Sequence, residues 1–289
     1  MGTINAISVL STGQVQIRPQ HAESNGTPFL WWLNTSRQWT PPKPINVYVI
    51  EHSDGLVLFD TGQDRSSVTD PDYFPTGFAG HIYNRLARFE IPADQTLTAQ
   101  LARLGHDIAD VKVAILSHLH QDHIGGLREL AHARIIVSDQ DWAEIDKPRA
   151  VLAGFLKQHI DIPGLHWDRV TPTPVDDPAL APFTAAHDVM GDGSLMLVPT
   201  PGHTPGSLSL LLRKPGIAPL LFVGDLTYDV NLLAQERIPG VGDTAGLHTS
   251  TRQVNEFATR NPGVAILAAH DAAAPTLLRT ALGQATHHA

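Results

Sequence analysis

Short apolar runs recur along the chain, separated by segments rich in glycine, proline and charged residues. A run such as Val113-Ala114-Ile115-Leu116 has the length and composition of a strand buried on both faces. The predicted strands are 47–52, 56–59, 111–116, 134–137, 195–198, 207–212, 220–223 and 264–267. Apolar residues at helical spacing predict helices at 94–104, 122–131, 138–146 and 249–260, with a further helix around 149–159. The mixture is typical of a layered α/β fold.

The remaining segments show neither the helical spacing of apolar residues nor a continuous apolar run. Residues 4–18 alternate well enough to predict two strands joined by a turn at Ser11-Thr12-Gly13. Residues 19–45 and 63–92 are predicted to be long irregular loops, and both carry several aromatic residues. We expect each loop to be a lid or a dimer contact, although aromatic residues also anchor long loops to a core. No linker, low-complexity segment or internal repeat divides the chain, so residues 1–289 are predicted to form a single domain.

The composition narrows the possible classes of function. The 289 residues carry a formal net charge of −9 and contain no cysteine. An acidic chain suits neither nucleic acid nor an anionic membrane, because both need a basic surface. Without cysteine, a metal ion must be held by histidine, aspartate or glutamate. The first residues lack the features of a signal peptide and no apolar stretch is long enough to span a membrane, so we expect cytoplasmic residence.

One stretch directly after the predicted strand 111–116 contains His118, His120, Asp122 and His123. His118 and His120 are two positions apart, so their side chains point the same way on an extended chain. Asp122 and His123 follow where two glycines predict a turn. Imidazole and carboxylate groups are the ligands of a zinc-like catalytic ion when no thiolate is present. The stretch offers more ligands than one closed tetrahedral site takes, which suggests two metal ions.

The same pattern, an apolar strand followed by a histidine or an aspartate, occurs at three later places. Strand 195–198 leads to His203, strand 220–223 leads to Asp225, and strand 264–267 leads to His270. Active-site groups of layered α/β folds collect where strands end, so we expect these side chains to meet the first stretch. Asp60 ends the strand 56–59 and is either a turn residue or the acceptor of a hydrogen bond from a ligand histidine.

These residues, in this order, resemble those of the metallo-β-lactamase superfamily. The resemblance spans residues 45–271 and rests on His118-x-His120-x-Asp122-His123, Pro201-Gly202-His203-Thr204, Gly224-Asp225, His270 and Phe59-Asp60-Thr61-Gly62. It implies an αβ/βα sandwich, in which two mixed β-sheets lie face to face with helices on the outer faces. It also implies that His118, His120 and His203 hold one divalent ion, that Asp122, His123 and His270 hold a second, and that Asp225 bridges both. Zinc is the expected metal, and iron, manganese and cobalt fit the same donors.

Within the superfamily, the chain most resembles the N-acyl homoserine lactonases. Asp225-x-x-Tyr228 carries this resemblance, because a tyrosine at that spacing donates to the substrate carbonyl oxygen in those enzymes; the alternative is a core tyrosine at a helix start. The resemblance implies ring-opening hydrolysis of a lactone by a metal-bridging hydroxide, with Asp122 carrying a proton to the leaving alkoxide. Gln121 departs from the pattern, since several lactonases have an apolar or aromatic residue there, and the acyl pocket is expected to differ. The candidate contacts for the acyl chain are Trp31, Trp32, Phe74, Phe78 and Tyr83.

Other functions use the same set of ligands. A phosphotriesterase, an aryl esterase or a thioesterase similar to glyoxalase II fits the metal pair, because the pair barely distinguishes carbonyl from phosphoryl centres. A non-catalytic binding protein that has kept the ligands is a third interpretation. We expect a small-molecule lactone or ester as the partner, and neither nucleic acid nor a membrane. The resemblance also implies a homodimer, for which residues 31–39 are the candidate contact.

Overall fold

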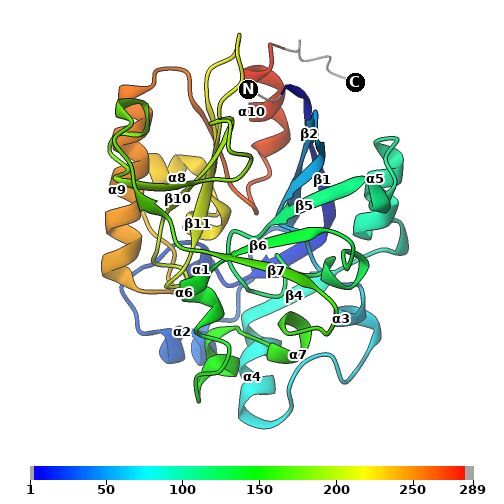
Figure 1. The fold of residues 1–289 in the computed structure, drawn as a ribbon. Coiled ribbons are helices and arrows are strands. Elements are labelled where there is room, and N and C mark those ends of the chain that lie inside the picture. Colours follow the sequence, from blue (N-terminus) through cyan, green and yellow to red (C-terminus); the bar gives the residue numbers. More distant parts are fainter. Residues whose placement is uncertain (1–2, 284–289) are drawn as a thin grey trace.

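The apolar runs form two mixed β-sheets that lie face to face, as predicted (Figure 1). A computed structural model describes residues 3–283. In the first sheet the order is β4 (Ala87–Glu90), β1 (Ile4–Ile17), β2 (Lys43–His52), β3 (Gly55–Phe59), β5 (Val111–Ile115), β6 (Arg134–Ser138) and β7 (His166–Val170). In the second it is β13 (Ala265–Leu267), β12 (Leu220–Phe222), β11 (Leu208–Leu212), β10 (Leu195–Pro199), β9 (Ala185–Asp188) and β8 (Thr173–Pro174).

Helices cover the outer faces of both sheets, which completes the αβ/βα sandwich and confirms the predicted fold class (Figure 1). Within residues 3–283, six further turns are 3-10 helices. The α-helices are α1 (Pro19–Ala22), α2 (Phe29–Thr35), α3 (Ser66–Thr69), α4 (Gly77–Leu86), α5 (Leu97–Arg103), α6 (Asp139–Trp142), α7 (Lys157–Ile160), α8 (Val230–Ala234), α9 (Thr244–Arg260) and α10 (Ala274–Ala281). Within residues 3–283, no helix is both long and apolar enough to cross a membrane.

The strands are apolar on both faces because each face is covered. In β2, Tyr48 and Ile50 point into the core between the sheets, whereas Val47 and Val49 pack against the side that α5 covers. In β10, Leu195 and Leu197 join the core between the sheets, and Met196 and Val198 face α8 and α9. Successive side chains of a strand point to opposite faces, so two buried faces require a continuous apolar run.

The segment Ile4–Ile17 forms one strand, so the predicted hairpin within 4–18 is wrong. β1 pairs with β2 and, at its end, with β4. Its register shifts between Ser11 and Gln14, and Gly13 has a positive φ of 111°. A glycine in that conformation occurs in bulges as well as in turns. Here the bulge lets the chain continue in the same direction, so β1 remains one strand instead of folding back as a hairpin.

The predicted helix at 122–131 is also wrong, because that segment contains only the 3-10 turn Leu127–Glu129. Gly125 lies so close to the chain after β3 that an added Cβ would be 2.1 Å from the backbone nitrogen of Asp64. Its own nitrogen donates to the carbonyl oxygen of Gly62 at 2.6 Å. The segment therefore uses its backbone groups to bond the neighbouring loop rather than to build a helix.

Other predicted helices exist with different bounds. The helix predicted at 138–146 is only α6, and the one around 149–159 is divided into a 3-10 turn and α7. The helix predicted at 249–260 begins earlier, at Thr244, where the Asp243 side chain accepts from the nitrogen of Gly246. Such an N-cap satisfies a backbone donor of the first turn.

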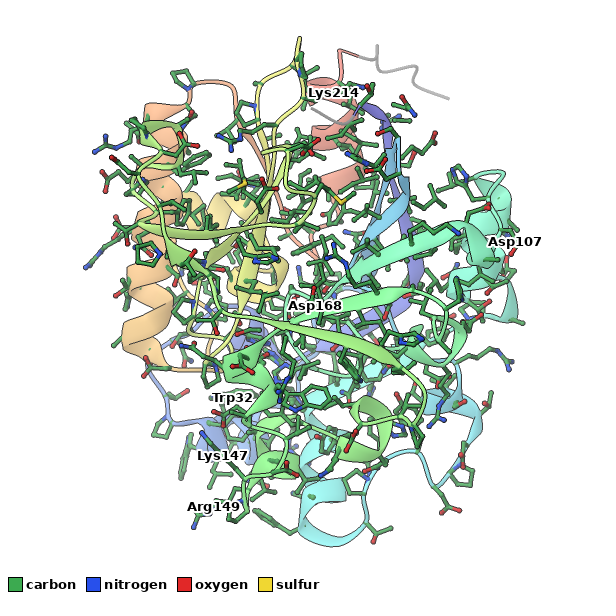
Figure 2. The ribbon with its side chains drawn as sticks, viewed as in Figure 1. Trp32, Asp107, Lys147, Arg149, Asp168 and Lys214 are labelled. Carbon is green, nitrogen blue, oxygen red and sulfur yellow. The ribbon has the colours of Figure 1, made fainter. Side chains whose placement is uncertain are left out.

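The regions 19–45 and 63–92 are not irregular loops. The first contains α1 and α2 and leads into β2, and the second contains α3, α4 and β4. In the lower part of Figure 1, α2 and α4 lie below the sheets, and the two helices are in contact. Figure 2 shows Trp32 inside this region, whereas charged side chains such as Lys147 and Arg149 lie at the periphery.

Candidate metal centre and substrate cavity

The four strand ends meet at one edge of the sandwich. β3 and β5 run parallel in the first sheet, so Asp60 and the stretch from His118 emerge side by side. β10 and β12 both run antiparallel to β11, and β13 runs parallel to β12. Their carboxyl ends therefore point the same way and carry His203, Asp225 and His270 to that edge.

The predicted ligands form three overlapping groups. In each group, one nitrogen or oxygen atom from every member lies within 4.8 Å of the others. The groups are His118, His120 and His203; His118, His123 and Asp225; and Asp122, His123 and His270. The structure therefore brings together all seven residues, from four segments of the chain.

Most of the histidines have one ring nitrogen bound to the protein and the other turned toward the cluster. Nδ1 of His123 lies 2.8 Å from Asp60 Oδ2, and Nδ1 of His270 lies 2.9 Å from the carbonyl oxygen of Pro44. Nε2 of His120 lies 3.0 Å from the carbonyl oxygen of Ala153. These acceptors fix the tautomer and leave a lone pair on the opposite nitrogen, as in metal-binding histidines; for His120 that nitrogen, Nδ1, lies 2.9 Å from Nε2 of His203.

Several buried atoms at the centre of the cluster have no hydrogen-bond partner among the described residues. Such atoms normally find a partner, since leaving one unpaired costs about 1–3 kcal/mol. They are Nε2 of His118, His123 and His270, and Oδ1 of Asp225. Convergent lone pairs from imidazole and carboxylate fit divalent metal ions, and the cysteine-free donor set fits nitrogen- and oxygen-bound metals.

Asp60 supports the cluster from behind. Its buried carboxylate accepts hydrogen bonds from the backbone nitrogen of Ser117 at 2.7 Å, from the Ser117 hydroxyl at 3.0 Å and from His123. Its φ of 63° is unusual for a residue other than glycine. The three hydrogen bonds hold this conformation, which aims the carboxylate at the histidine rather than into solvent.

The charges in the cluster favour a cation at its centre. Burial opposes ionisation of Asp122, but His270, whose Nε2 lies 3.4 Å from Asp122 Oδ2, and the charge of His123 lower its pKa to about 2. Burial also opposes a charge on His123, yet Asp60 and Asp225 raise its pKa well above the usual range. On the other side, burial lowers the pKa of His203 to about 3, so this imidazole is neutral and free to act as a ligand.

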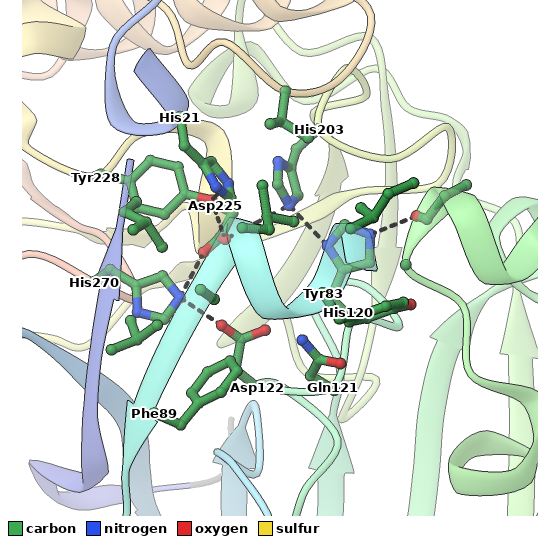
Figure 3. Close-up of a pocket in the computed structure, with 18 of the residues that line it drawn as sticks. His21, Tyr83, Phe89, His120, Gln121, Asp122, His203, Asp225, Tyr228 and His270 are labelled. Carbon is green, nitrogen blue, oxygen red and sulfur yellow. Dashed lines mark hydrogen bonds and ion pairs between the residues drawn. The ribbon is translucent and has the colours of Figure 1, made fainter. Parts of the chain in front are cut away.

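Tyr228 lies at the edge of the cluster, where its hydroxyl donates to Asp225 Oδ2 at 2.8 Å (Figure 3). Its ring stacks on that of His270, with centroids 5.5 Å apart. Burial raises the pKa of Tyr228 well above the usual value, so the hydroxyl stays protonated at neutral pH. A protonated hydroxyl beside the cluster is available as a hydrogen-bond donor to a substrate.

A largely apolar cavity opens onto the cluster. It encloses about 750 Å³ including its open mouth, and its base contains His120, Asp122, His203, Asp225, Tyr228 and His270 (Figure 3). The walls come from β1, α2, α4, β4 and the turn at 150–153. The apolar wall residues are Val15, Ile17, Phe29, Ile82, Leu86, Ala87, Phe89, Leu152, Ala153 and Val241.

Of the five residues predicted to contact an acyl chain, Tyr83 lines this cavity. Trp31 and Phe78 are not in its lining and are 65% and 64% exposed. Trp32 is buried behind the wall against Phe29, and Phe74 packs on the outer side against Tyr83 and Phe89. On α2 and α4, Phe29 and Tyr83 face the cavity while Trp31 and Phe78 face solvent, so one side of each helix lines the cavity and another is exposed.

Two further polar residues line the cavity: His21 was missed by sequence reasoning, and Gln121 was noted only as a departure from the lactonase pattern that should change the acyl pocket. His21, on α1, has its Nε2 2.9 Å from the Tyr228 hydroxyl. Gln121 is 8% exposed and lines the cavity, and its Oε1 is buried with no hydrogen-bond partner in the described part of the chain. No local pattern marks His21, whereas the position of Gln121 between two predicted ligands was a usable signal.

The sequence of the chain matches the model of the metallo-β-lactamase superfamily over residues 40–270. The chain therefore belongs to this superfamily. An N-acyl homoserine lactonase AttM from Rhizobium radiobacter is 30% identical over 79% of this chain and 82% of that protein. An AttM from Azorhizobium caulinodans is 31% identical over the same shares.

Solved structures show the same fold. A B. thuringiensis AiiA variant with N-decanoyl-L-homoserine bound at the active site has a TM-score of 0.73 and 22% identity, covering 93% of this chain and 94% of that one. The dizinc quorum-quenching lactonase AidC, in complex with a product, has a TM-score of 0.61 and 16% identity, covering 94% and 90%.

Proposed function

We propose that this protein is a metal-dependent hydrolase that opens the ring of an N-acyl homoserine lactone. The observation that carries the proposal is the convergence of unpartnered imidazole and carboxylate atoms at the base of an apolar cavity. Metal-binding groups at the bottom of the cavity suit hydrolysis, and apolar cavity walls suit the binding of an acyl chain. The relatives named N-acyl homoserine lactonase AttM support the same substrate class.

The described residues fit two divalent ions, with Asp225 between a group containing His118, His120 and His203 and a group containing Asp122, His123 and His270. When bound, such ions supply hydroxide at neutral pH and stabilise negative charge on oxygen. The orientation of the ligands is the contribution of the chain itself. Asp60 and the carbonyl oxygens of Ala153 and Pro44 hold His123, His120 and His270 with their lone pairs toward the ions.

Hydrolysis adds water across the ring ester, so the carbonyl carbon gains a hydroxyl oxygen and the ring oxygen leaves with a proton. Tyr228 is placed to donate a hydrogen bond to the carbonyl oxygen as negative charge develops on it. Asp122 is ionised and lines the cavity, so it can accept a proton and return it to the leaving oxygen. The apolar walls bind the acyl chain by removing its surface from water.

An acidification assay tests this function directly, because each ring opened releases one carboxylic acid. We expect turnover of N-acyl homoserine lactones to exceed that of paraoxon and of p-nitrophenyl esters, measured in parallel on one sample of known metal content. If fully metal-loaded protein opens no lactone of any acyl length, the proposal is wrong. Turnover confined to paraoxon or to the nitrophenyl esters would instead support the alternative hydrolases.

Zinc, a homodimer and cytoplasmic residence are the finer parts of the proposal. Nitrogen and oxygen donors in a small site support zinc. Exposed Leu30, Trp31 and Phe78 on the neighbouring helices α2 and α4 support a contact between two copies. Metal analysis of the purified protein and its mass in solution by light scattering test the metal and the dimer.

A further inference from the structure

His21 contacts the hydroxyl of Tyr228 and lines the cavity beside the cluster. It lies on the short helix α1, is buried, and meets the tyrosine ring edge to face, with centroids 5.2 Å apart and an interplanar angle of 74°. Its Nε2 is 2.9 Å from the tyrosine hydroxyl oxygen (Figure 3). That oxygen therefore has two hydrogen-bond partners, His21 and Asp225.

The direction of both hydrogen bonds follows from the donors available. An ionised carboxylate only accepts, so the single hydroxyl proton of Tyr228 points at Asp225 Oδ2. His21 Nε2 must then carry a proton and donate it to the hydroxyl oxygen. The other tautomer would set two lone pairs against each other and leave an N–H on Nδ1, a buried atom that has no acceptor among the described residues.

The position of α1 is fixed independently of the His21 ring. The carbonyl oxygen of His21 accepts from the nitrogen of Gly240 at 3.0 Å, and the nitrogen of Ser24 donates to the carbonyl oxygen of Ile238 at 2.8 Å. The Arg18 side chain donates to the carbonyl oxygens of Arg85 and Gln38. A change of the ring alone therefore leaves the backbone of α1 tied to its neighbours.

We propose that His21 is a positioning residue that keeps the hydroxyl proton of Tyr228 on the Asp225 side, at the base of the cavity, from where it can turn to the reacting carbonyl oxygen. This inference rests on the proposed lactone hydrolysis. By donating to the oxygen, His21 occupies one side of the hydroxyl, so the proton stays on the Asp225 side, which is also the base of the cavity. Hydrogen bonds in a chain also polarise one another, so a hydroxyl that accepts from His21 becomes a stronger donor.

Kinetics of single and double variants test the role. Tyr228→Phe removes a preorganised donor and should lower kcat about 100-fold. His21→Leu removes one hydrogen bond to that donor and should lower kcat about tenfold, with KM unchanged within about twofold. His21→Gln restores an N–H near the place of Nε2 and should recover kcat to within about threefold of the original enzyme. Metal content and thermal midpoint of each variant show whether the fold and the ions are kept.

Double variants separate this role from a structural one. If His21 acts through Tyr228, adding His21→Leu to Tyr228→Phe lowers kcat by no more than about twofold, because the shared interaction is already lost. Tyr83→Phe is the matched control, since Tyr83 also lines the cavity but donates its hydroxyl to the carbonyl oxygen of Val151. In that background His21→Leu should keep its full effect. An equal loss in both backgrounds, or a rise in KM alone, would overturn the proposal.

NMR of the histidine tautomer tests the role of His21 without a measurement of lactone turnover. In protein with 15N-labelled histidine, we expect NMR to show His21 as the Nε2–H tautomer, with its Nε2 resonance shifted by Tyr228→Phe. A proton on Nδ1 would overturn the positioning role even if no substrate is found. Turnover of lactones that is insensitive to His21→Leu would overturn the inference and leave the proposed function intact.

Discussion

The strand-end cluster and the cavity wall lie next to each other but are built differently. The cluster takes its ligands from the chain directly after β5, β10, β12 and β13, within a few residues of each strand. The wall takes its apolar residues from β1, α2, α4 and β4, and from turns near Ala153 and Val241. Strand ends are held by the sheets, whereas the wall depends on contacts between distant short helices. We therefore expect a single substitution in the cluster to change kcat or metal binding strongly. A substitution in the wall should cause only a small change in the preference for one substrate over another.

The largest effect should follow from loss of a ligand. His120→Ala should lower lactone turnover at least about a thousandfold, because hydroxide at neutral pH depends on bound metal. Turnover and metal content are measured together. His166→Ala is the matched control, since His166 is exposed at the start of β7 and belongs to none of the three ligand groups. Similar losses of turnover and metal in both variants would contradict the assignment of His120 as a metal ligand.

Asp141 connects two loops of the cluster, and its titration should be visible in stability. It accepts from the nitrogens of Leu119 and Gly206 and from the Thr204 hydroxyl. Burial raises the pKa of Asp141 to about 6, more than these hydrogen bonds lower it, against 3.8 for an exposed carboxyl. Between these two values the folded state holds the proton that the unfolded state has lost, so stability falls as pH rises.

The expected loss is up to about 3 kcal/mol between about pH 4 and 6.5, at about 1.4 kcal/mol for each unit of pKa difference. Urea unfolding of the protein and of Asp141→Asn across that range measures it. The difference in the free energy of unfolding between the two proteins should change with pH in that window. Parallel curves would contradict a raised pKa and would indicate that Asp141 stays ionised in the folded protein.

Substitution of a residue that only holds a ligand in place should have a smaller effect than substitution of the ligand itself. Asp60→Ala removes the acceptor of His123 and of Ser117, and should weaken metal binding about 10- to 100-fold. Competition with a chromophoric chelator measures the affinity. Asp54→Ala is the control, because Asp54 is an exposed acidic residue of the β2–β3 turn. Equal affinity in Asp60→Ala would show that the histidine needs no support.

The smallest effect should arise in the wall. Gln121→Leu replaces a buried amide whose Oε1 has no hydrogen-bond partner in the described chain, so an unsubstituted acyl chain then packs against an apolar side chain instead of an unpaired polar group. We expect KM for long unsubstituted chains to fall about threefold while kcat changes less than about twofold. A large fall in kcat would mean that Gln121 belongs to the chemistry rather than to the wall.

What could be read from the sequence follows the same division. The strands with long apolar runs and the residues that meet at the cluster were predictable, because an apolar run and the residue just after it are neighbours in both sequence and space. The two-sheet sandwich was implied by the resemblance to the superfamily, and the strands β4, β7, β8 and β9 were not predicted. The hairpin at 4–18 and the helix at 122–131 were wrong, since Gly13 forms a bulge and Gly125 bonds another loop. Both depend on partners far along the chain.

Most residues of the cavity wall could not be predicted from the sequence, because contacts between distant elements decide which side chains line the cavity. Aromatic residues in 19–45 and 63–92 marked the right region, but the sides of α2 and α4 that face the cavity are set by packing between them. Trp31 therefore faces solvent while Phe29 lines the cavity. His21 carries no local signal, because its importance comes from the hydroxyl of Tyr228, which is 207 positions away.

Stepwise reconstitution tests the central claim most directly. Protein freed of metal by a chelator is titrated with Zn²⁺, and ring opening of an N-acyl homoserine lactone is followed by acid release at each step. We expect no turnover without metal and a rise that levels off at about two ions per chain. Full turnover in the metal-free protein, or none with both ions bound, would contradict it.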